Sequence, residues 1–131
     1  MKKNEDLIEK RYGRFKVTDD GIIVGYPTEV DMDTPDAKDM VLLLRQLNPT
    51  PGKMRVLLDQ RNVHRKLTSG ARSEIKTQLQ DEVDRIAVLI GNTISRFFAS
   101  TVLMALGQGD KVRVFESEGQ AFAWLRENRS R

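Results

Sequence analysis

Four short apolar runs alternate with segments of helical periodicity, and this alternation constrains the fold more than any other feature of the chain. The runs cover residues 22–26, 55–58, 85–90 and 111–115. Strands that alternate with helices build α/β domains, in which helices cover a largely parallel sheet. A chain of 131 residues has the length of one such domain and buries enough surface to fold without disulfides.

The strands are expected from their residue types and from the turns between them. Asp19, Asp20 and Gly21 form a turn signal between strands over residues 12–18 and 22–26, which predicts an N-terminal β-hairpin. A run that is apolar on both faces is typical of a central parallel strand. Central strands are therefore expected over residues 54–58 and 85–90, and an edge strand over the alternating residues 111–115.

Four helices are expected from caps and from apolar spacing. The first covers residues 35–47, with Thr34 as its N-cap. The others begin at Thr68 or Ser69, at residue 92 or 93, and after a capping box at Ser117. Residues 1–11 are polar and expected to fray, and residues 12–128 form the domain. We predict one α/β domain with a mixed, mostly parallel sheet, an N-terminal β-hairpin and four helices.

Composition narrows the classes of function. The chain has no cysteine, which excludes disulfides, zinc–thiolate sites and thiol nucleophiles. No apolar run approaches the roughly 20 residues that span a bilayer, and residues 1–6 lack the apolar core of a secretory signal. A net charge of +3 is mild for a nucleic-acid binder. We expect a cytoplasmic protein without stable membrane insertion and without a nucleic-acid partner.

The carboxyl ends of the two central strands predict a cationic shelf. Adjacent parallel strands bring their following loops to one rim of the sheet, where the next helices begin. Helix N-termini offer unpaired N–H groups and partial positive charge, which favour phosphate or carboxylate. The candidate anion- or partner-binding residues are Asp59, Arg61, Arg65, Lys66, Gly70, Arg72, Ser95 and Arg96. In the alternative interpretation the polar residues cap helices, Asp59 pairs with Arg61, and the arginines are solvated.

Two further clusters favour structural interpretations over chemical ones. His64 lies near Asp59 and Ser69 in sequence, but a catalytic triad is recognised by geometry, and a surface histidine is the simpler interpretation. Four acids resemble a cation site but lack the glycine and final glutamate of a calcium loop, and acids are expected at a helix start: Asp31, Asp33, Asp36 and Asp39. We therefore predict no catalytic residue, no metal and no cofactor.

Several local motifs resemble a known family. Residues 57–63 read LLDQRNV, and Ser69-Gly70-Ala71-Arg72 follow them. Residues 86–89 precede Ser95 and Arg96, and residues 112–125 end in an F-x-x-E-x-x-A-x-x-W-L pattern, which is the most specific part. Together these segments resemble the SpoIIAA-like, STAS/Sec14-type domains of bacteria, in an uncharacterised branch, over residues 12–126.

The resemblance implies a STAS-like fold and two alternative functions. Better-studied STAS relatives are anti-sigma-factor antagonists, which are phosphorylated at a helix N-terminus, bind a kinase and often self-associate. The corresponding phospho-acceptors here are Thr68 and Ser69, although the relatives' Asp-Ser-Ser-Gly is Leu67-Thr68-Ser69-Gly70 in this chain. This implies a non-enzymatic regulatory module that forms a homodimer and binds a protein partner such as a kinase or regulator.

Sec14-type relatives imply the alternative, a carrier of a lipid or small anionic ligand. That function requires an apolar pocket, and the candidate residues for it are Phe97, Phe98 and Trp124. The aromatic spacing is also that of helices packed on a core.

Overall fold

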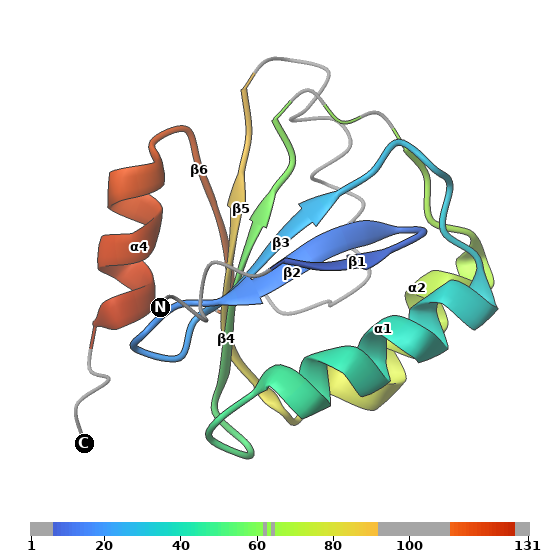
Figure 1. The fold of residues 1–131 in the computed structure, drawn as a ribbon, viewed down its shortest axis with the longest axis horizontal. Helices are drawn as coiled ribbons and strands as arrows, with labels where there is room; N and C mark the ends of the chain where they lie inside the picture. The colour runs from blue at the N-terminus through green and yellow to red at the C-terminus, as the bar shows by residue number, and fades with distance from the viewer. Residues whose placement is uncertain (1–6, 62, 64, 92–110, 128–131) are drawn as a thin grey trace.

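The sheet of this protein has six strands, and their order in space is the order in the sequence (Figure 1). The computed structural model describes residues 7–61, 63, 65–91 and 111–127. The strands are β1 (Ile8–Lys10), β2 (Gly13–Val17), β3 (Ile23–Pro27), β4 (Met54–Asp59), β5 (Val83–Leu89) and β6 (Val112–Phe115). The helices are α1 (Thr34–Leu47), α2 (Ser69–Leu79) and α4 (Glu118–Arg126).

The sheet is mixed, with an antiparallel part and a parallel part. Strands β1, β2 and β3 pair antiparallel, whereas β3, β4, β5 and β6 pair parallel. This confirms the predicted hairpin, the central strands and the edge position of the last strand. Residues 8–10 had been assigned to a fraying polar segment, and that was wrong, because Ile8 pairs with Phe15 and Lys10 with Gly13.

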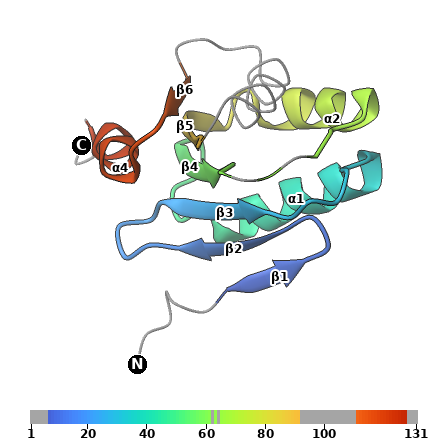
Figure 2. The same ribbon diagram turned by 90° about the horizontal axis from the view of Figure 1, so that it is seen from above.

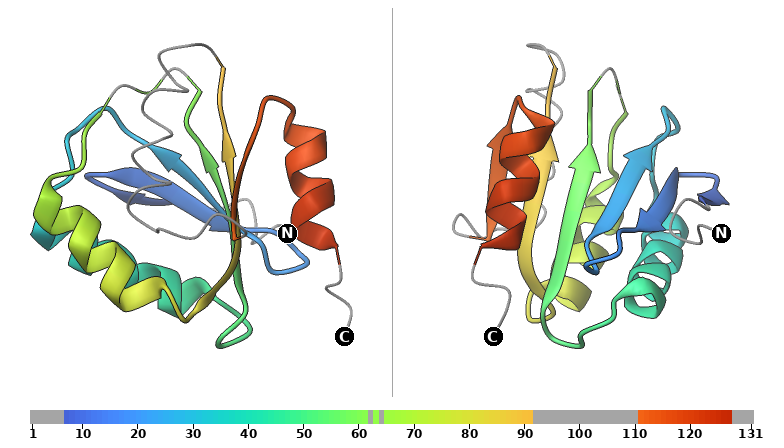
Figure 3. Two further views of the ribbon diagram at one scale, coloured as in Figure 1. Left: turned by 180° about the vertical axis from the view of Figure 1, so that it is seen from behind. Right: turned by 60° about the vertical axis from the view of Figure 1, so that its left-hand side comes forward.

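Helices α1 and α2 cover one face of the sheet, and α4 covers the other (Figures 2 and 3). We call these the helix-pair face and the α4 face. Successive strand residues point to opposite faces. In β4, Val56 therefore joins the core beneath α1 and α2, while Leu57 joins the core beneath α4. Ile86 and Ala87 in β5 divide in the same way.

The helix starts are set by side-chain caps. Asp33, and not Thr34 as expected, is the N-cap of α1, and its side chain and that of Asp36 form a capping box. The acidic residue accepts the backbone N–H of Asp36 and leaves Thr34 and Pro35 as the first helical residues. Thr68, one of the two caps expected for α2, is its N-cap, and Ser117 caps α4 as predicted.

Three helices lie within the part of the chain that the structure describes, against four expected. The remaining expected helix, from residue 92 or 93 to residue 105, falls in the segment 92–110, which lies outside the described residues.

Candidate functional site

The rim beyond β4 begins with a closed ion pair. The carboxylate of Asp59 accepts hydrogen bonds from Nε of Arg61 at 2.9 Å and from the terminal guanidinium nitrogen at 2.8 Å. Arg61 also lies 3.6 Å from Glu118 at the start of α4. The hydrogen bond with Asp59 raises the pKa of Arg61 above its ordinary value. Both charges are thus engaged locally, as the structural interpretation of this pair predicted.

The start of α2 has exposed polar residues next to an N-cap side chain that is already hydrogen-bonded to the helix. Oγ1 of Thr68 accepts the backbone N–H of Ala71 at 3.1 Å, while Ser69 and Gly70 are exposed. Arg72 is half-buried and donates to the carbonyl of Leu67 at 2.7 Å. The guanidinium therefore lies against the turn that precedes the helix. Of the two candidate hydroxyls, that of Thr68 already stabilises the helix end.

The starts of α1 and α2 approach closely at Gly70, where a larger residue would displace the side chain of Thr34. A Cβ atom on Gly70 would lie 2.2 Å from Oγ1 of Thr34, well inside van der Waals contact. The chain before each helix is joined as well, because Met32 and Leu67 form a parallel β-bridge. The N–H of Met32 donates to Lys66, and the N–H of Thr68 donates to Met32. The two helix starts therefore form one continuous surface.

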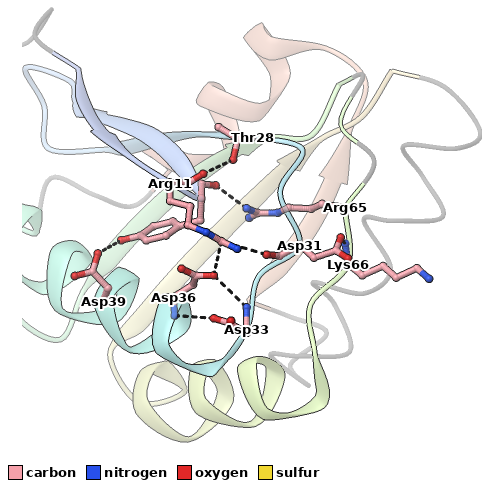
Figure 4. Close-up of polar contacts among 9 residues, drawn as sticks. Arg11, Thr28, Asp31, Asp33, Asp36, Asp39, Arg65 and Lys66 are labelled. Carbon is pink, nitrogen blue, oxygen red and sulfur yellow. Dashed lines mark hydrogen bonds and ion pairs between the residues drawn. The ribbon is translucent and has the colours of Figure 1, made fainter.

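Arg65 lies inside the molecule, apart from the exposed shelf on which the sequence placed it. Its exposed fraction is 8%. One terminal nitrogen donates to the carbonyl of Tyr12 at 2.6 Å, whereas Nε is buried and has no hydrogen-bond partner (Figure 4). Among the described residues, no carboxylate lies within ion-pair distance of this guanidinium. Burial lowers the pKa of Arg65 to about 10, against the opposing effect of Asp36 and Asp31.

The acidic residues before and within α1 hold the β1–β2 hairpin and the cap in place (Figure 4). Asp36 binds Arg11 at 2.8 Å, and Asp39 accepts the hydroxyl of Tyr12 at 2.7 Å. Asp31 accepts the backbone N–H of Lys66 at 2.9 Å. Across residues 7–61, 63, 65–91 and 111–127, no cluster of acids or histidine is arranged to hold a metal ion. The acids thus act as caps and anchors.

A cavity of about 50 Å³ lies between the sheet and the helix pair. Its wall is almost entirely apolar and includes Phe15, three methionines, and Val56. The methionines are Met32, Met40 and Met54. Two of the described wall residues, Gln60 and Arg65, are polar. Ligand pockets are mostly apolar with a few convergent polar groups, and this cavity shares that lining but is far smaller than the roughly 300–1,000 Å³ of a pocket for a drug-sized ligand.

Trp124, a predicted pocket residue, lies on the opposite face of the sheet and does not line this cavity. Its ring packs against Phe115 with centroids 5.7 Å apart. The guanidinium carbons of Arg85 and Arg113 lie 4.8 and 5.0 Å from the same ring. Two cations at this distance from an indole are favourable cation–π contacts, and they help to hold the ring in the core of the α4 face. The tryptophan is therefore a core residue here, as its helical spacing allowed.

Several predicted site residues lie outside the described residues. They are His64, Ser95, Arg96, Phe97 and Phe98. The sequence analysis also missed two residues that lie at or near the cavity, Tyr12 and Gln60. Tyr12 is buried, pairs with Asp39 and supplies the carbonyl that binds Arg65. Gln60 lies two residues beyond Leu58, in step with Val56 and Leu58 on one side of β4, and this alternation was the available signal that it would be buried.

The comparisons with known proteins agree on the fold. The model of the SpoIIAA-like family matches residues 23–126. A search of curated proteins gave no match. A solved structure of an uncharacterised protein of the DUF3478 family from Shewanella loihica PV-4, described as having a SpoIIAA-like fold, is similar over 92% of this chain and 90% of that one. The TM-score is 0.57 and the identity 14%, so this likeness concerns the fold alone.

No helix in the described part of the chain is long and apolar enough to cross a membrane. The match to the family model extends from β3 to the end of α4 and includes the β4 rim, the start of α2 and most of the cavity wall. The chain belongs to the SpoIIAA-like family.

Proposed function

We propose that this chain is a non-enzymatic STAS-type module that binds a protein partner through the start of α2. The observation that supports this proposal is the exposure of Lys66, Ser69 and Gly70 on the surface where α1 and α2 begin. Unpaired backbone donors and partial positive charge at a helix start favour an acidic group of a partner. The match to the SpoIIAA-like family adds support, because the resemblance to STAS relatives implies phosphorylation at this helix start and binding of a partner.

Ser69 is the better of the two candidate phospho-acceptors within this proposal. The oxygen of Thr68 is used as the cap of α2, so that its modification would remove a helix-stabilising contact. Ser69 is exposed at the first helical position, where a phosphate would lie on the helix N-terminus beside Lys66. Phosphorylation there would reverse the local charge and switch off binding of an acidic partner.

The test compares Ser69→Asp with Ser73→Asp, which places the same charge about one turn further along α2 on another exposed serine. An acid at the first helical position favours the helix dipole, so Ser69→Asp is expected to fold normally. Quantitative mass spectrometry would measure host proteins retained by each immobilised variant. We expect a partner that binds the unmodified chain and the Ser73 variant and is lost with the Ser69 variant. Equal retention by all three chains would contradict the proposed surface.

The cavity beneath α1 and α2 favours a second candidate function, binding of a small ligand. Its wall is apolar, and its volume of about 50 Å³ exceeds the roughly 10–15 Å³ that one water molecule needs. Native mass spectrometry of the gently purified protein, with the denatured mass as reference, would detect such a ligand. A bare chain in every preparation would count against this second function.

A further inference from the structure

Arg65 is a buried cation with less than its normal complement of partners. Only 8% of the residue is exposed, and the one hydrogen bond that it makes to the described residues goes to a neutral carbonyl, that of Tyr12. Its Nε has no acceptor among the described residues. A buried charge without a counter-charge costs free energy, and buried polar groups in folded proteins are almost always satisfied. Something further is therefore expected beside this guanidinium.

The acids nearest to Arg65 are engaged elsewhere. Asp36 binds Arg11 at 2.8 Å and also accepts the backbone N–H of Asp33. Asp31 accepts the backbone N–H of Lys66 at 2.9 Å. Both acids oppose the lowering of the pKa of Arg65 from a distance, but neither forms an ion pair with it. The guanidinium keeps its charge at neutral pH and retains an open donor.

The open donor belongs to a residue that lines an apolar cavity. Among the described residues of the wall, Arg65 and Gln60 are the two polar ones, and the others are aliphatic, aromatic, methionine or proline. The volume is about a third of the roughly 150 Å³ in which an engineered cavity holds benzene. A short or branched alkyl group therefore fits more readily than a ring or a long chain. Three methionines in the wall allow modest expansion, since their side chains are flexible.

We propose that this cavity binds a small aliphatic monocarboxylate, with the alkyl group among the methionines and the carboxylate on Arg65. The planar guanidinium suits a carboxylate, and a single cation is balanced by a single negative charge. A dianionic phosphate would bring a second charge into an apolar wall whose described residues include no other cation. The inference rests on the second proposed function, since it names the ligand class for that cavity.

The test is an NMR titration that observes the Nε–H groups of the arginines and the methyl groups of the methionines. The probe is isovalerate, and the matched control ligand is isovaleramide, which has the same shape and no charge. Arg55 is an internal control, because it is 5% exposed and its Nε is paired with Asp84 at 2.7 Å. We expect isovalerate to shift the Arg65 Nε–H and the wall methionines while the Arg55 signal stays unchanged.

Isovaleramide is expected to bind at least about tenfold more weakly, because it cannot form the charged pair. Equal binding of the two probes would overturn the carboxylate assignment and leave the ligand-binding function in place. No response to either probe would overturn the monocarboxylate proposal, and a bare chain in the native mass spectra would then overturn the ligand-binding function as well. Equal shifts at Arg55 and Arg65 would show non-specific binding and also overturn the proposal.

Two variants complete the test. Arg65→Met removes the head-group contact, and we expect the affinity for isovalerate to fall to that for isovaleramide. Val83→Ile adds a methylene group to the cavity wall and leaves Arg65 in place, so it remains informative if the first variant does not fold. We expect it to weaken both probes together. Retained isovalerate affinity in both variants would overturn the proposal. Inorganic phosphate, added as a third probe, would overturn the monocarboxylate assignment if it bound more tightly than isovalerate.

Discussion

The two faces of the sheet each contain a buried arginine, and the two arginines differ in their hydrogen-bond and ion-pair partners. On the α4 face, Arg55 binds Asp84 through two nitrogens at 2.7 and 2.6 Å and donates to the carbonyl of Glu127 at 2.7 Å. On the helix-pair face, Arg65 has one carbonyl and an open Nε beside a cavity. The first arginine joins β4, β5 and α4, whereas the second has a donor that no described residue satisfies.

Burial alone therefore does not distinguish a charged residue with a structural role from one that binds a ligand. Arg55 satisfies its donors with groups of the fold, so the α4 face is complete without a ligand. The Nε–H of Arg65 has no acceptor among the described residues, and Arg65 also lines the cavity, where packing is incomplete. Two independent deficits at one place, in polar partners and in volume, indicate a binding site more strongly than either does alone.

The largest effect is expected for Arg55→Met. The substitution leaves Asp84 without its counter-charge and the carbonyls of Leu125 and Glu127 without a donor. We expect the free energy of unfolding to fall by about 2–4 kcal/mol, less than for a fully buried pair because Asp84 is partly solvated. Urea denaturation measures this. A decrease in the free energy of unfolding of less than about 1 kcal/mol would contradict the structural role of Arg55 that distinguishes it from Arg65.

A second comparison concerns glycines at the second position of α2 and of α4. A Cβ on Gly70 would meet Thr34 at 2.2 Å, whereas a Cβ on Gly119 would meet nothing closer than 3.8 Å. Gly70→Ala is therefore expected to destabilise by about 1–3 kcal/mol, and Gly119→Ala to stabilise by about 0.5–1 kcal/mol through helix propensity.

Thr34→Ala removes the clashing oxygen and should restore most of the stability lost with Gly70→Ala. Thermal denaturation of the two single variants and the double variant completes the cycle. Additive losses would show that contact with Thr34 is not the reason for glycine at this position.

The helix-pair face is also expected to respond to alkaline pH through Tyr12. Burial, and then the hydrogen bond to Asp39, raise the pKa of this phenol well above its ordinary value. The folded chain thus keeps a proton that the unfolded chain releases above about pH 10, so stability is full below that pH and declines above it.

Between pH 9 and pH 11 we expect the stability difference between the native chain and Tyr12→Phe to narrow by about 1.4 kcal/mol. Arg65, whose pKa burial lowers to about 10, titrates in both chains and cancels in this difference. Urea denaturation at each pH measures it, with Tyr26→Phe as the matched control on the other tyrosine. A difference that does not change with pH would contradict the raised pKa.

The smallest change in the free energy of unfolding is expected for Arg65→Met, and this variant tests the contrast with Arg55 most directly. The apolar side chain removes the desolvation cost of a buried charge that lacks a counter-charge. It also removes the hydrogen-bond donor to the carbonyl of Tyr12, which opposes this gain. We expect the free energy of unfolding to change by less than about 1 kcal/mol, towards greater stability. A loss as large as that of Arg55→Met would show that Arg65 is structural.

The sequence predicted the parts of the fold that depend on local pattern. Strands β3 to β6 follow from apolar runs, and α2 and α4 from the caps Thr68 and Ser117. Strand β1 was missed because its three residues carry a single apolar side chain, Ile8, and its pairing with β2 supplies the order. The cap of α1 was displaced by one residue because Asp33 competes with Thr34 for the same role.

The candidate site was harder to predict because its chemistry depends on contacts between distant residues. Arg65 sits in a polar stretch that predicts a solvated side chain, and its burial depends on Tyr12, 53 positions away. The requirement for Gly70 comes from Thr34, and the cavity comes from elements across the domain. The Asp59–Arg61 pair, only two residues apart, could be read directly from the sequence.

The β-bridge between Met32 and Leu67 has a consequence for how the chain length can vary. It fixes the connection before α1 against the connection before α2, with the N–H of Met32 on Lys66 and that of Thr68 on Met32. A residue inserted between Lys66 and Thr68 would shift this register, separate the two helix starts and move Arg65 relative to Tyr12. Homologues are thus expected to keep this spacing constant and to place length variation in turns such as that around Gly52, where a side chain would meet nothing within 4 Å.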